Sequence, residues 1–555
     1  MKKYILILLG LIFSTSIFSN DISDKWFFSS INSNTINNTE FNDDDFLVIN
    51  TNNTFEYQIT SKQLYAKGTW ELKKNKILFS YILPNDTIRE YLVAISNDSL
   101  ILSENNTNYC FYKKKQVLIN QNGNSWINNI FRGILGLLSL IFLAYLFSRD
   151  KKNINWSLVI KGLLIQLLLA ILILKVPIIQ NAFEWISSLF VTVLQFSKQG
   201  ALFLFGETLV NSNEFGAIFA FQILPTILFF SALTSLLFYL GILQKIVFVF
   251  AYIMKKTLNL SGAESLSAAG NIFLGQTESP LLIKPYIEKM TMSELLCLMS
   301  GGMATIAGGV LAAYIGFLGG NDPEQQLFFA KHLLTASVMS APAAVVLAKI
   351  LLPETEEINE DMTISNEELG ANSFEAISIG TGQGVRLAIN VGAMLLVFIA
   401  FITMINYFLK DFVGDITNLN SSIISFTNGQ YTGLTLEFLL GYLLSPLTWL
   451  MGVCKEDMIL VGQLLGEKTI LNEFVAYISL ADLKESGKFF EEKSIIISTY
   501  ILCGFANFLS IGIQIGGIGS LAPNRTSDLS KLGILALIAG TLASLLTAVI
   551  VGAIL

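Results

Sequence analysis

The stretch GQTESP, residues 275–280, interrupts an apolar segment and decides how the chain folds. It lies between the runs ESLSAAGNIFL and LLIKPYIEKM, and each run is about half as long as the ~20 residues that a membrane-spanning helix needs. A glycine and a proline break the helix around Gln276, Thr277 and Glu278. Because unpaired backbone groups are very unfavourable in lipid, this pattern predicts a re-entrant helical hairpin whose tip faces protein or a polar cavity.

The composition of the whole chain is typical of a membrane protein. Of its 555 residues, 53% are hydrophobic and only 14% are charged, which excludes an ordinary soluble domain. The net charge of -7 provides no basic surface for nucleic acid, and no G-x-x-x-x-G-K-[ST] phosphate loop occurs. The four cysteines and the single His332 lack the spacing of a metal site. We therefore predict no enzyme activity, no nucleic-acid partner and no direct use of ATP.

The N-terminal part of the chain differs from the rest. Residues 1–20 have a basic start, a short apolar run and small polar residues, as in a secretory signal peptide. An uncleaved anchor helix is the alternative, and the shortness of the run favours the signal peptide. Residues 21–125 contain short strand-like stretches separated by polar turns, which predicts a small all-β domain. The stretch KGTWEL resembles lipocalin sequences, although a plain β meander accounts for the same pattern.

Long apolar segments follow from Phe131 onward, and about eight reach the length of a spanning helix. They are residues 131–148, 157–179, 215–242, 295–319, 328–352, 387–410, 496–519 and 532–555. Residues 182–208 and 243–257 are more amphipathic or shorter, and we expect them to lie along the membrane interface. The basic loop SRDKK follows the first span, so the positive-inside rule places it and the later loop PNRTSDLSK in the cytoplasm and the β domain outside.

A second interrupted region repeats the pattern of the first. Between residues 445 and 480, polar residues separate two apolar half-spans: Gly466, Glu467, Lys468, Asn472 and Glu473. A glycine-rich polar span follows each hairpin. Transporters built from repeats place their substrate site where such elements meet near the membrane midplane, so the duplication favours a transporter over a continuous pore.

The polar residues of the first hairpin indicate a binding site. An acidic side chain near the midplane costs at least about 2.5 to 3.5 kcal/mol, so Glu278 marks a substrate or ion path. Gln276 and Thr277 offer amide and hydroxyl groups that match a polar, uncharged heterocycle or sugar. Thr305, facing Asn271, would supply neutral oxygens for a weakly held Na⁺.

These segments resemble the concentrative nucleoside transporter family, in order and over residues 131–555. The resemblance is carried by GNIFLGQTESPLLIKPYIEKM, NVGAML, SPLTWLMGV, LNEFVAY and LCGFANFLSIGIQIGGIGSLAPNR. It implies scaffold helices in residues 131–255 and, in residues 256–555, a transport core with two hairpins in an inverted repeat. It also implies a homotrimer, and we expect it in a bacterial inner membrane. Residues 1–125 lie outside the resemblance, and the positive-inside rule places their β domain in the periplasm. Each protomer would take up nucleosides together with Na⁺ by an elevator-like movement.

The resemblance further implies the site residues. The substrate positions are Gln276, Thr277, Glu278, Val310, Glu473, Phe505, Asn507 and Ser510. Those of the first hairpin and Val310 would meet the nucleobase, Glu473 would accept ribose hydroxyls from the second hairpin, and Phe505 would pack beside the sugar and base. The Na⁺ ligands would be the side chains of Asn271 and Thr305 and the carbonyls of Leu274 and Ile306. No organic cofactor is implied.

Two alternatives stay open at this point. Glu278 or Glu473 would carry H⁺ in place of a bound Na⁺ in a proton-coupled symporter. A membrane receptor would use the β domain to sense a ligand and would have lost turnover at the nucleoside site. The short loops offer no output domain for such a receptor.

Overall fold

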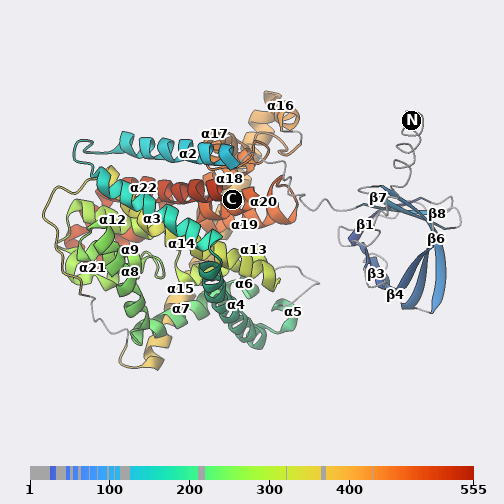
Figure 1. Cartoon of the computed structure of the whole chain (residues 1–555), viewed down its shortest axis with the longest axis horizontal. Coiled ribbons are helices and arrows are strands. Elements are labelled where there is room, and N and C mark those ends of the chain that lie inside the picture. The colour runs from blue at the N-terminus through green and yellow to red at the C-terminus, as the bar shows by residue number, and fades with distance from the viewer. Residues whose placement is uncertain are drawn as a thin grey trace, which may run out of the picture. The chain divides into compact units, whose positions relative to one another are not determined.

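The computed structural model divides the chain into two compact units, residues 1–118 and 119–555, each with its own hydrophobic core (Figure 1). It describes residues 25–32, 45–50, 54–59, 64–73, 76–83, 86–96, 99–104, 107–112, 126–210, 219–320, 322–363, 370–427 and 429–555. The predicted signal peptide, residues 1–20, lies outside the described residues.

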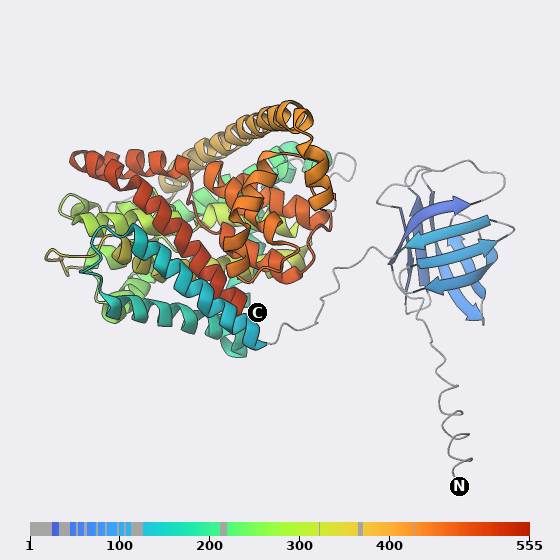
Figure 2. The ribbon, with the colours of Figure 1, turned by 90° about the horizontal axis from the view of Figure 1, so that it is seen from above.

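The first unit is a closed barrel of eight antiparallel strands that follow one another in sequence order (Figure 2). The strands are β1 (Lys25–Asn32), β2 (Phe46–Ile49), β3 (Thr54–Ile59), β4 (Leu64–Lys73), β5 (Lys76–Leu83), β6 (Thr87–Ser96), β7 (Ser99–Glu104) and β8 (Thr107–Tyr112). Along β5, Ile77, Phe79 and Tyr81 are buried and alternate with more exposed residues, because successive side chains point to opposite faces of a sheet. The prediction of an all-β domain is confirmed.

The second unit consists of helices. They are α2 (Trp126–Phe147), α3 (Trp156–Lys175), α4 (Pro177–Phe205), α5 (Glu207–Val210), α6 (Phe219–Gln222), α7 (Leu224–Tyr239), α8 (Ile242–Leu258), α9 (Gly262–Gly270), α10 (Ser279–Leu282), α11 (Lys284–Ile287), α12 (Met292–Ala304), α13 (Gly308–Gly319), α14 (Pro323–Leu351), α15 (Ser373–Tyr407), η2 (Phe408–Gly414), α16 (Leu419–Phe426), α17 (Leu436–Leu450), α18 (Met458–Ile470), α19 (Glu473–Glu485), α20 (Glu492–Leu502), α21 (Phe508–Leu521), η3 (Pro523–Arg525) and α22 (Thr526–Ile554).

Within the described part of the chain, eight helical segments are long and apolar enough to cross a membrane. They are Asn128–Phe147, Trp156–Lys175, Pro177–Phe205, Ala220–Tyr239, Met292–Gly319, Pro323–Leu351, Ser373–Gly414 and Pro523–Ile554. The predicted number of spans is therefore confirmed, but the set of spans differs from the prediction at two places.

The first difference is α4. Residues 182–208 were expected along the interface because their polar residues suggest an amphipathic helix, yet α4 is 29 residues long and qualifies as a span. Its Ser187 and Ser197 are buried, so these two polar positions pack against protein and do not need the lipid headgroups, whereas Glu184 and Gln195 are exposed.

The second difference is the segment 496–519, which was expected to be one continuous span. It is split into α20 and α21 by a break at residues 503–507. Gly504 lies in the break with φ +101°, and a Cβ there would come within 2.6 Å of the Met303 carbonyl oxygen. Only glycine allows this backbone conformation and this close approach, so the apolar run cannot continue as one helix.

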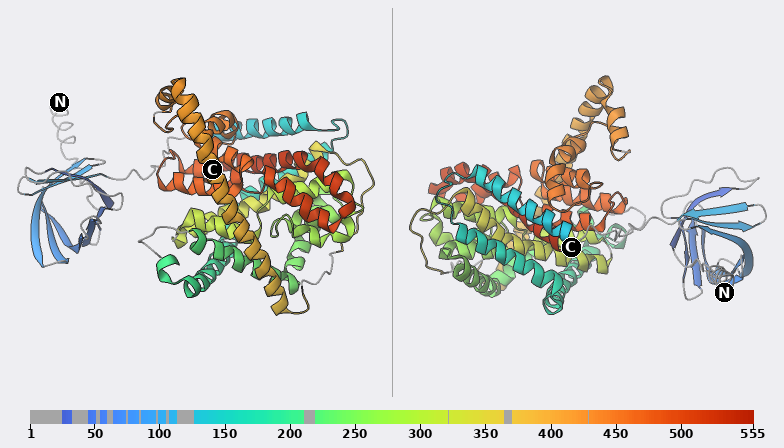
Figure 3. Two further views of the ribbon diagram at one scale, coloured as in Figure 1. Left: turned by 180° about the vertical axis from the view of Figure 1, so that it is seen from behind. Right: turned by 45° about the horizontal axis from the view of Figure 1, so that its top comes forward.

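The spans differ strongly in burial. The most apolar window of α14 is 100% buried in protein, and those of α12–α13 and α22 are 83% buried, whereas that of α15 is only 17% buried. Figure 3 shows α15 running along the outside of the helical unit. The interior helices therefore carry the contacts that build a site, and α15 presents an apolar surface suited to lipid.

The loop at residues 148–152 lies beside the ends of two distant helices. The Arg149 amide donates to the Leu351 carbonyl at 2.9 Å, and the Arg149 guanidinium donates to the Lys531 carbonyl at 3.3 Å. The basic loop and the start of α22 thus lie at the same end of the bundle, as the predicted topology requires.

Candidate functional site

The first hairpin is formed by α9, a stretch of turns and the two short helices α10 and α11. Helix α9 ends at Gly270, and the chain does not resume a helix until Ser279. In the turn, the Glu278 carboxylate accepts a hydrogen bond from the Gly275 amide at 3.0 Å. Residues 275–278 therefore form the predicted non-helical tip, whereas Ser279 and Pro280, expected in the interruption, already begin α10. Glu278 satisfies a backbone group of its own hairpin.

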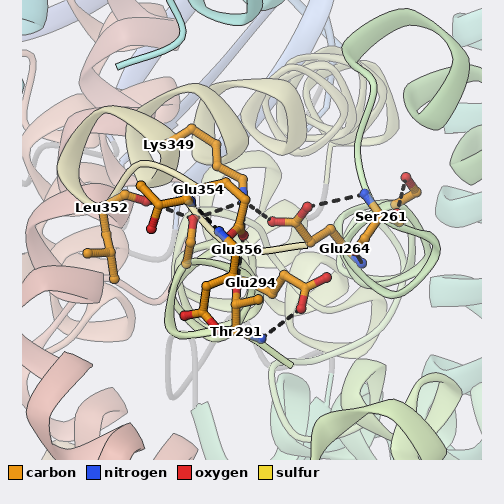
Figure 4. Close-up of polar contacts among 11 residues, drawn as sticks. Ser261, Glu264, Thr291, Glu294, Lys349, Leu352, Glu354 and Glu356 are labelled. Carbon is orange, nitrogen blue, oxygen red and sulfur yellow. Dashed lines mark hydrogen bonds and ion pairs between the residues drawn. The ribbon is translucent and has the colours of Figure 1, made fainter. Parts of the chain in front are cut away.

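A buried lysine fixes the base of this hairpin (Figure 4). Lys349, in the last turn of α14, lies 2.5 Å from a carboxylate oxygen of Glu264 and 3.3 Å from one of Glu354, and it donates to the Ser293 hydroxyl at 2.9 Å. Glu264 and Lys349 are 1% and 5% exposed. Since each residue comes from a different element, the cluster joins the starts of α9 and α12 to the end of α14.

The sequence analysis missed this cluster, although a signal was available. Both α9 and α12 begin with a capping box, in which a Ser or Thr and a Glu three residues later satisfy each other's backbone amides. The first is formed by Ser261 and Glu264, and the second by Thr291 and Glu294. The pattern S/T-x-x-E marks both helix starts, but nothing local shows that Lys349 lies between them.

The second hairpin is formed by α18 and α19, which are separated by a break at residues 471 and 472. The Asn472 side chain caps α19 by accepting from the Val475 amide at 3.0 Å. Glu473 is the first residue of α19, where the positive end of the helix dipole favours a carboxylate. Gly466, Glu467 and Lys468 were expected between the two half-spans, but they lie within the last turns of α18 because the helix continues to Ile470.

Lys468 of α18 is fully buried, and its ammonium binds groups outside its own hairpin. Its ammonium donates to the carbonyls of Ile501 at 2.9 Å and Cys503 at 3.1 Å, and to the Ser544 hydroxyl at 2.9 Å. These carbonyls are at the end of α20, where the helix stops and its last C=O groups have no helical partner. Lys468 therefore stabilises the break between α20 and α21.

Two neutral donors hold the Glu473 carboxylate, which is 3% exposed. One oxygen accepts from the Tyr314 hydroxyl at 3.2 Å, and the other accepts from the Asn507 amide at 2.7 Å. Asn507 also caps α21, because its side-chain oxygen accepts from the Ser510 amide at 2.9 Å. Tyr314 was missed by the sequence analysis, and only its isolated hydroxyl in an apolar, glycine-rich span distinguished it.

The tip of the first hairpin packs against α21. Gln276 donates to the Ser510 hydroxyl at 3.3 Å, and its side-chain oxygen is buried without a hydrogen-bond partner. A Cβ at Gly517 would lie 2.8 Å from the Thr277 methyl group, so the two segments are in close contact. The structure thus connects Gln276, Ser510, Asn507 and Glu473 through hydrogen bonds from one hairpin to the other.

The remaining predicted substrate residues lie on the helix breaks. Val310 is buried in the first turn of α13, just after the break that separates α12 from α13. Phe505 is buried in the break between α20 and α21. Thr277 is exposed at the tip, and Glu278 is half-buried and turned back to its own loop.

The predicted ion ligands Asn271 and Thr305 both lie next to Gly301. The Thr305 hydroxyl donates to the Gly301 carbonyl at 2.9 Å, and the Asn271 amide nitrogen is 2.8 Å from the position of a Cβ on Gly301. Asn271 is 1% exposed, and neither polar atom of its side chain has a partner. Leu274 and Ile306 are buried in the adjoining turns. An unpartnered amide oxygen beside a hydroxyl fits a cation with neutral oxygen ligands.

A multivalent metal site is not offered by the described residues, because among them no group of three or more His, Cys, Asp or Glu is placed to hold an ion. Multidentate carboxylate or thiolate clusters are the usual sites of Ca²⁺ and Zn²⁺. The donor set at Asn271 and Thr305 suits a monovalent ion that must be released again.

Comparison with known proteins gives the same assignment over the helical unit. Models described as "Na+ dependent nucleoside transporter N-terminus", "Nucleoside recognition" and "Na+ dependent nucleoside transporter C-terminus" match residues 135–208, 220–321 and 332–552. An uncharacterized transporter of Haemophilus influenzae is 41% identical over 430 residues, covering 76% of this chain and 97% of the relative.

Two further relatives have more informative names. Sodium/nucleoside cotransporter 1 of Rattus norvegicus is 38% identical over 437 residues, and the match covers 76% of this chain and 63% of the rat protein. The structure of CNTnw in an inward-facing substrate-bound state is 38% identical, with a TM-score of 0.69, and covers 76% of this chain and 98% of that chain.

Proposed function

Since the chain belongs to the concentrative nucleoside transporter family, we propose that it takes up nucleosides together with Na⁺ across a bacterial inner membrane. It works as a homotrimer whose transport core moves in an elevator-like manner against the scaffold helices. The observation that carries the proposal is the pair of hydrogen bonds that Tyr314 and Asn507 donate to Glu473. They fix a buried carboxylate at the point where the two hairpins are connected.

Glu473 is suited to bind a ribose. A carboxylate offers about four lone-pair sites, and the side chains of Tyr314 and Asn507 occupy one site on each oxygen of Glu473. The free sites accept two neighbouring hydroxyls, with the stronger hydrogen bonds that an ionised acceptor makes. The position at the start of α19 stabilises the negative charge, which forms no ion pair within the described part of the chain.

Gln276 provides the complementary group for the base. Its amide nitrogen donates to Ser510, and its oxygen has no partner, so the side chain accepts from a ring N–H or an exocyclic amino group. Ser510 and Gln276 together present a donor and an acceptor toward one edge of a heterocycle. Such paired groups recognise a base without any charge.

Sodium binding is coupled to substrate binding through the first hairpin. Asn271 begins the turn that leads to Gln276, and the Phe273 carbonyl accepts from the Gly308 amide at 3.2 Å, which connects this turn to the break between α12 and α13. An ion held by Asn271 and Thr305 therefore orders the segment that carries the base-binding group. By linkage, the substrate raises the affinity for the ion by the same factor.

The orientation follows from the charged loops. The basic loop at residues 148–152 faces the cytoplasm, and the barrel lies in the periplasm. The eight candidate spans of the described residues are an even number, so we place the C-terminus in the periplasm as well.

Uptake into proteoliposomes tests the proposal. Radiolabelled uridine and adenosine are supplied with a Na⁺ gradient, a pH gradient or neither. Uptake that needs the Na⁺ gradient supports both substrate and ion. Uptake driven only by a pH gradient keeps nucleoside transport and replaces the Na⁺ site by proton transfer at Glu278 or Glu473. Absence of uptake by folded, trimeric protein contradicts the proposal and favours a nucleoside-sensing receptor.

A further inference from the structure

The barrel contains a cavity at one end. The opposite end is filled by side chains that are at most 1% exposed: Trp26, Ile49, Phe55, Ile77 and Leu100. The next inward side chains along the strands do not fill the barrel and leave a cavity of about 210 Å³. Phe79 and Tyr81 of β5 and Arg89 and Tyr91 of β6 line this cavity. An eight-stranded barrel is just wide enough to be filled by its own side chains or to hold one small ligand. In this barrel, side chains fill one end and a cavity remains at the other.

The walls of the cavity are aromatic. Phe28 and Phe111 lie on adjacent strands with their ring centroids 4.5 Å apart, and Phe79 faces the same space. Aromatic faces of this kind stack on flat rings and exclude water from them. A flexible alkyl chain is stabilised by such walls only through buried apolar area, whereas a flat ring is also stabilised by aromatic stacking.

Four tyrosine side chains line the cavity: Tyr57, Tyr81, Tyr91 and Tyr109. The hydroxyls of Tyr81 and Tyr91 are 3.3 Å apart and form a hydrogen bond. Burial raises the pKa of Tyr57, Tyr81 and Tyr109 above the usual value, so these groups stay neutral at physiological pH. Neutral hydroxyls donate and accept, and they therefore suit a ligand whose edge carries both C=O and N–H groups.

One charged residue, Arg89, lines the cavity, and it is paired with the carboxylate of Glu104. Arg89 and Glu104 are 3.5 Å apart, with side chains 52% and 22% exposed. Because Glu104 already balances the charge of Arg89, the cavity has no net charge from this pair and does not favour an anionic ligand. The Arg89 guanidinium still provides N–H donors to a ligand.

We propose that this cavity binds a nucleobase ring, either free or within a nucleoside. The ring stacks against the Phe side chains that line the cavity, and its C=O and N–H edge pairs with the hydroxyls of Tyr81 and Tyr91 and with Arg89. The volume equals that of about seven water molecules at ~30 Å³ each, which accommodates a single base with its sugar directed to the mouth. The choice of nucleobases among neutral ring compounds rests on the proposed function of the helical unit.

The test uses the full-length protein carrying Glu473→Gln, which removes ribose binding by the transport core. Equilibrium binding of radiolabelled uracil, uridine and adenosine is measured in lipid nanodiscs. We expect saturable binding of one molecule per chain. Leu102→Trp, which fills the cavity, abolishes it, and Tyr81→Phe combined with Tyr91→Phe weakens it about tenfold, the effect of losing hydrogen bonds worth ~1.4 kcal/mol in total.

Tyr65→Phe is the matched control, because Tyr65 is 43% exposed on the outer face of the barrel, where its hydroxyl donates to Glu56. It leaves binding unchanged. Near-ultraviolet circular dichroism shows that the Tyr→Phe variants keep their aromatic packing. These variants retain every ring and remove only hydroxyls, so their effect on binding is separate from an effect on folding.

Several results overturn the inference. They are the absence of base binding by the Glu473→Gln protein, base binding that survives Leu102→Trp, and displacement of the base by palmitate, which would assign the cavity to anionic amphiphiles. Uptake by the protein with native Glu473 is measured in parallel. Normal uptake without binding by the barrel rejects this inference alone, and binding by the barrel without uptake rejects the proposed function alone.

Discussion

The two re-entrant hairpins both interrupt a helix, but they differ in structure. The first has a nine-residue helix, a long turn and two four-residue helices, whereas the second has two 13-residue helices separated by a two-residue break. The carboxylate of Glu278 in the first hairpin accepts from its own loop. That of Glu473 in the second hairpin accepts from Tyr314 of α13 and from Asn507 in the break between α20 and α21. The irregular hairpin is suited to respond to an ion, and the regular one to hold a fixed carboxylate.

Each hairpin is associated with a buried lysine. Lys349 fixes the base of the first hairpin, whereas Lys468 lies on α18 of the second hairpin and supports the break between α20 and α21. Lys349 pairs with the carboxylates of Glu264 and Glu354, whereas Lys468 donates to two backbone carbonyls and a hydroxyl. The first lysine balances negative charge, and the second satisfies helix-end dipoles. Removing each one therefore leaves a different kind of unsatisfied group behind.

The largest effect is expected from Glu473→Gln. The amide keeps the shape of the side chain but loses the charge that strengthens the hydrogen bonds to ribose, so kcat/KM for uptake falls about 100-fold or more. Glu485→Gln, an exposed position at the other end of α19, is the matched control and leaves uptake unchanged. Proteoliposome uptake measures both, and normal uptake by the Glu473 variant would contradict the ribose assignment.

The two lysines test the comparison directly. Lys349→Met leaves Glu264 buried without its cation and lowers the free energy of unfolding by about 3 to 5 kcal/mol. Lys468→Met leaves only neutral oxygens unpaired and lowers it by about 1 to 3 kcal/mol. Thermal unfolding in detergent ranks the two variants, and the exposed Lys455→Met provides the control.

A second substitution identifies the cause. Adding Glu264→Gln to Lys349→Met removes the unpaired charge and restores part of the lost stability. Equal losses for the two lysines, without this rescue, would show that the charge of Glu264 is not the reason for the difference.

A smaller effect is expected from Thr305→Ala. The variant loses one neutral ion ligand, so the Na⁺ concentration for half-maximal uptake rises about tenfold, equivalent to ~1.4 kcal/mol. Thr257→Ala is the matched control, because the Thr257 hydroxyl also donates to the carbonyl four residues earlier but lies on the exposed face of α8. A Na⁺ response that is the same in both variants would place the ion elsewhere.

The smallest effect tests the contact between the first hairpin and α21. Gly517→Ala places a methyl group 2.8 Å from the Thr277 side chain, and the tip must move. We expect KM to rise about fivefold, at the low end of the ~1 to 3 kcal/mol of an overpacked contact. Gly516→Ala meets nothing within 4 Å and leaves KM unchanged. Identical KM values for the two variants would show that the tip does not rest on α21 during uptake.

The sequence predicted the local features of the fold because they depend on nearby residues. Hydropathy indicated the number of spans, and strand-like alternation indicated the β domain. A glycine, a proline and polar residues within apolar runs indicated the two hairpins. The prediction that residues 182–208 lie along the interface was wrong because it also used only nearby residues. The local pattern is amphipathic, but Ser187 and Ser197 are buried against protein.

The contacts of the candidate site depended on the tertiary structure. Tyr314 and Glu473 are 159 residues apart, and Gln276 and Ser510 are 234 residues apart. No local pattern distinguishes Lys349 from a lysine that lies on the surface at the end of a helix. Family resemblance identified individual positions, but it did not show which atoms already have partners.

By itself, therefore, the sequence determined a helical membrane transporter with two broken-helix repeats and a separate all-β domain, and the closure of that domain into a barrel came from the structure. These properties follow from the hydropathy of each segment and from the glycine, proline and polar residues that end its helices. Only the tertiary structure decided that Lys349 holds the first hairpin, that Lys468 holds the break after α20, and that the barrel is filled at one end and hollow at the other. The reason is that pairing and cavities depend on which distant side chains reach the same point, and packing of whole elements sets that distance.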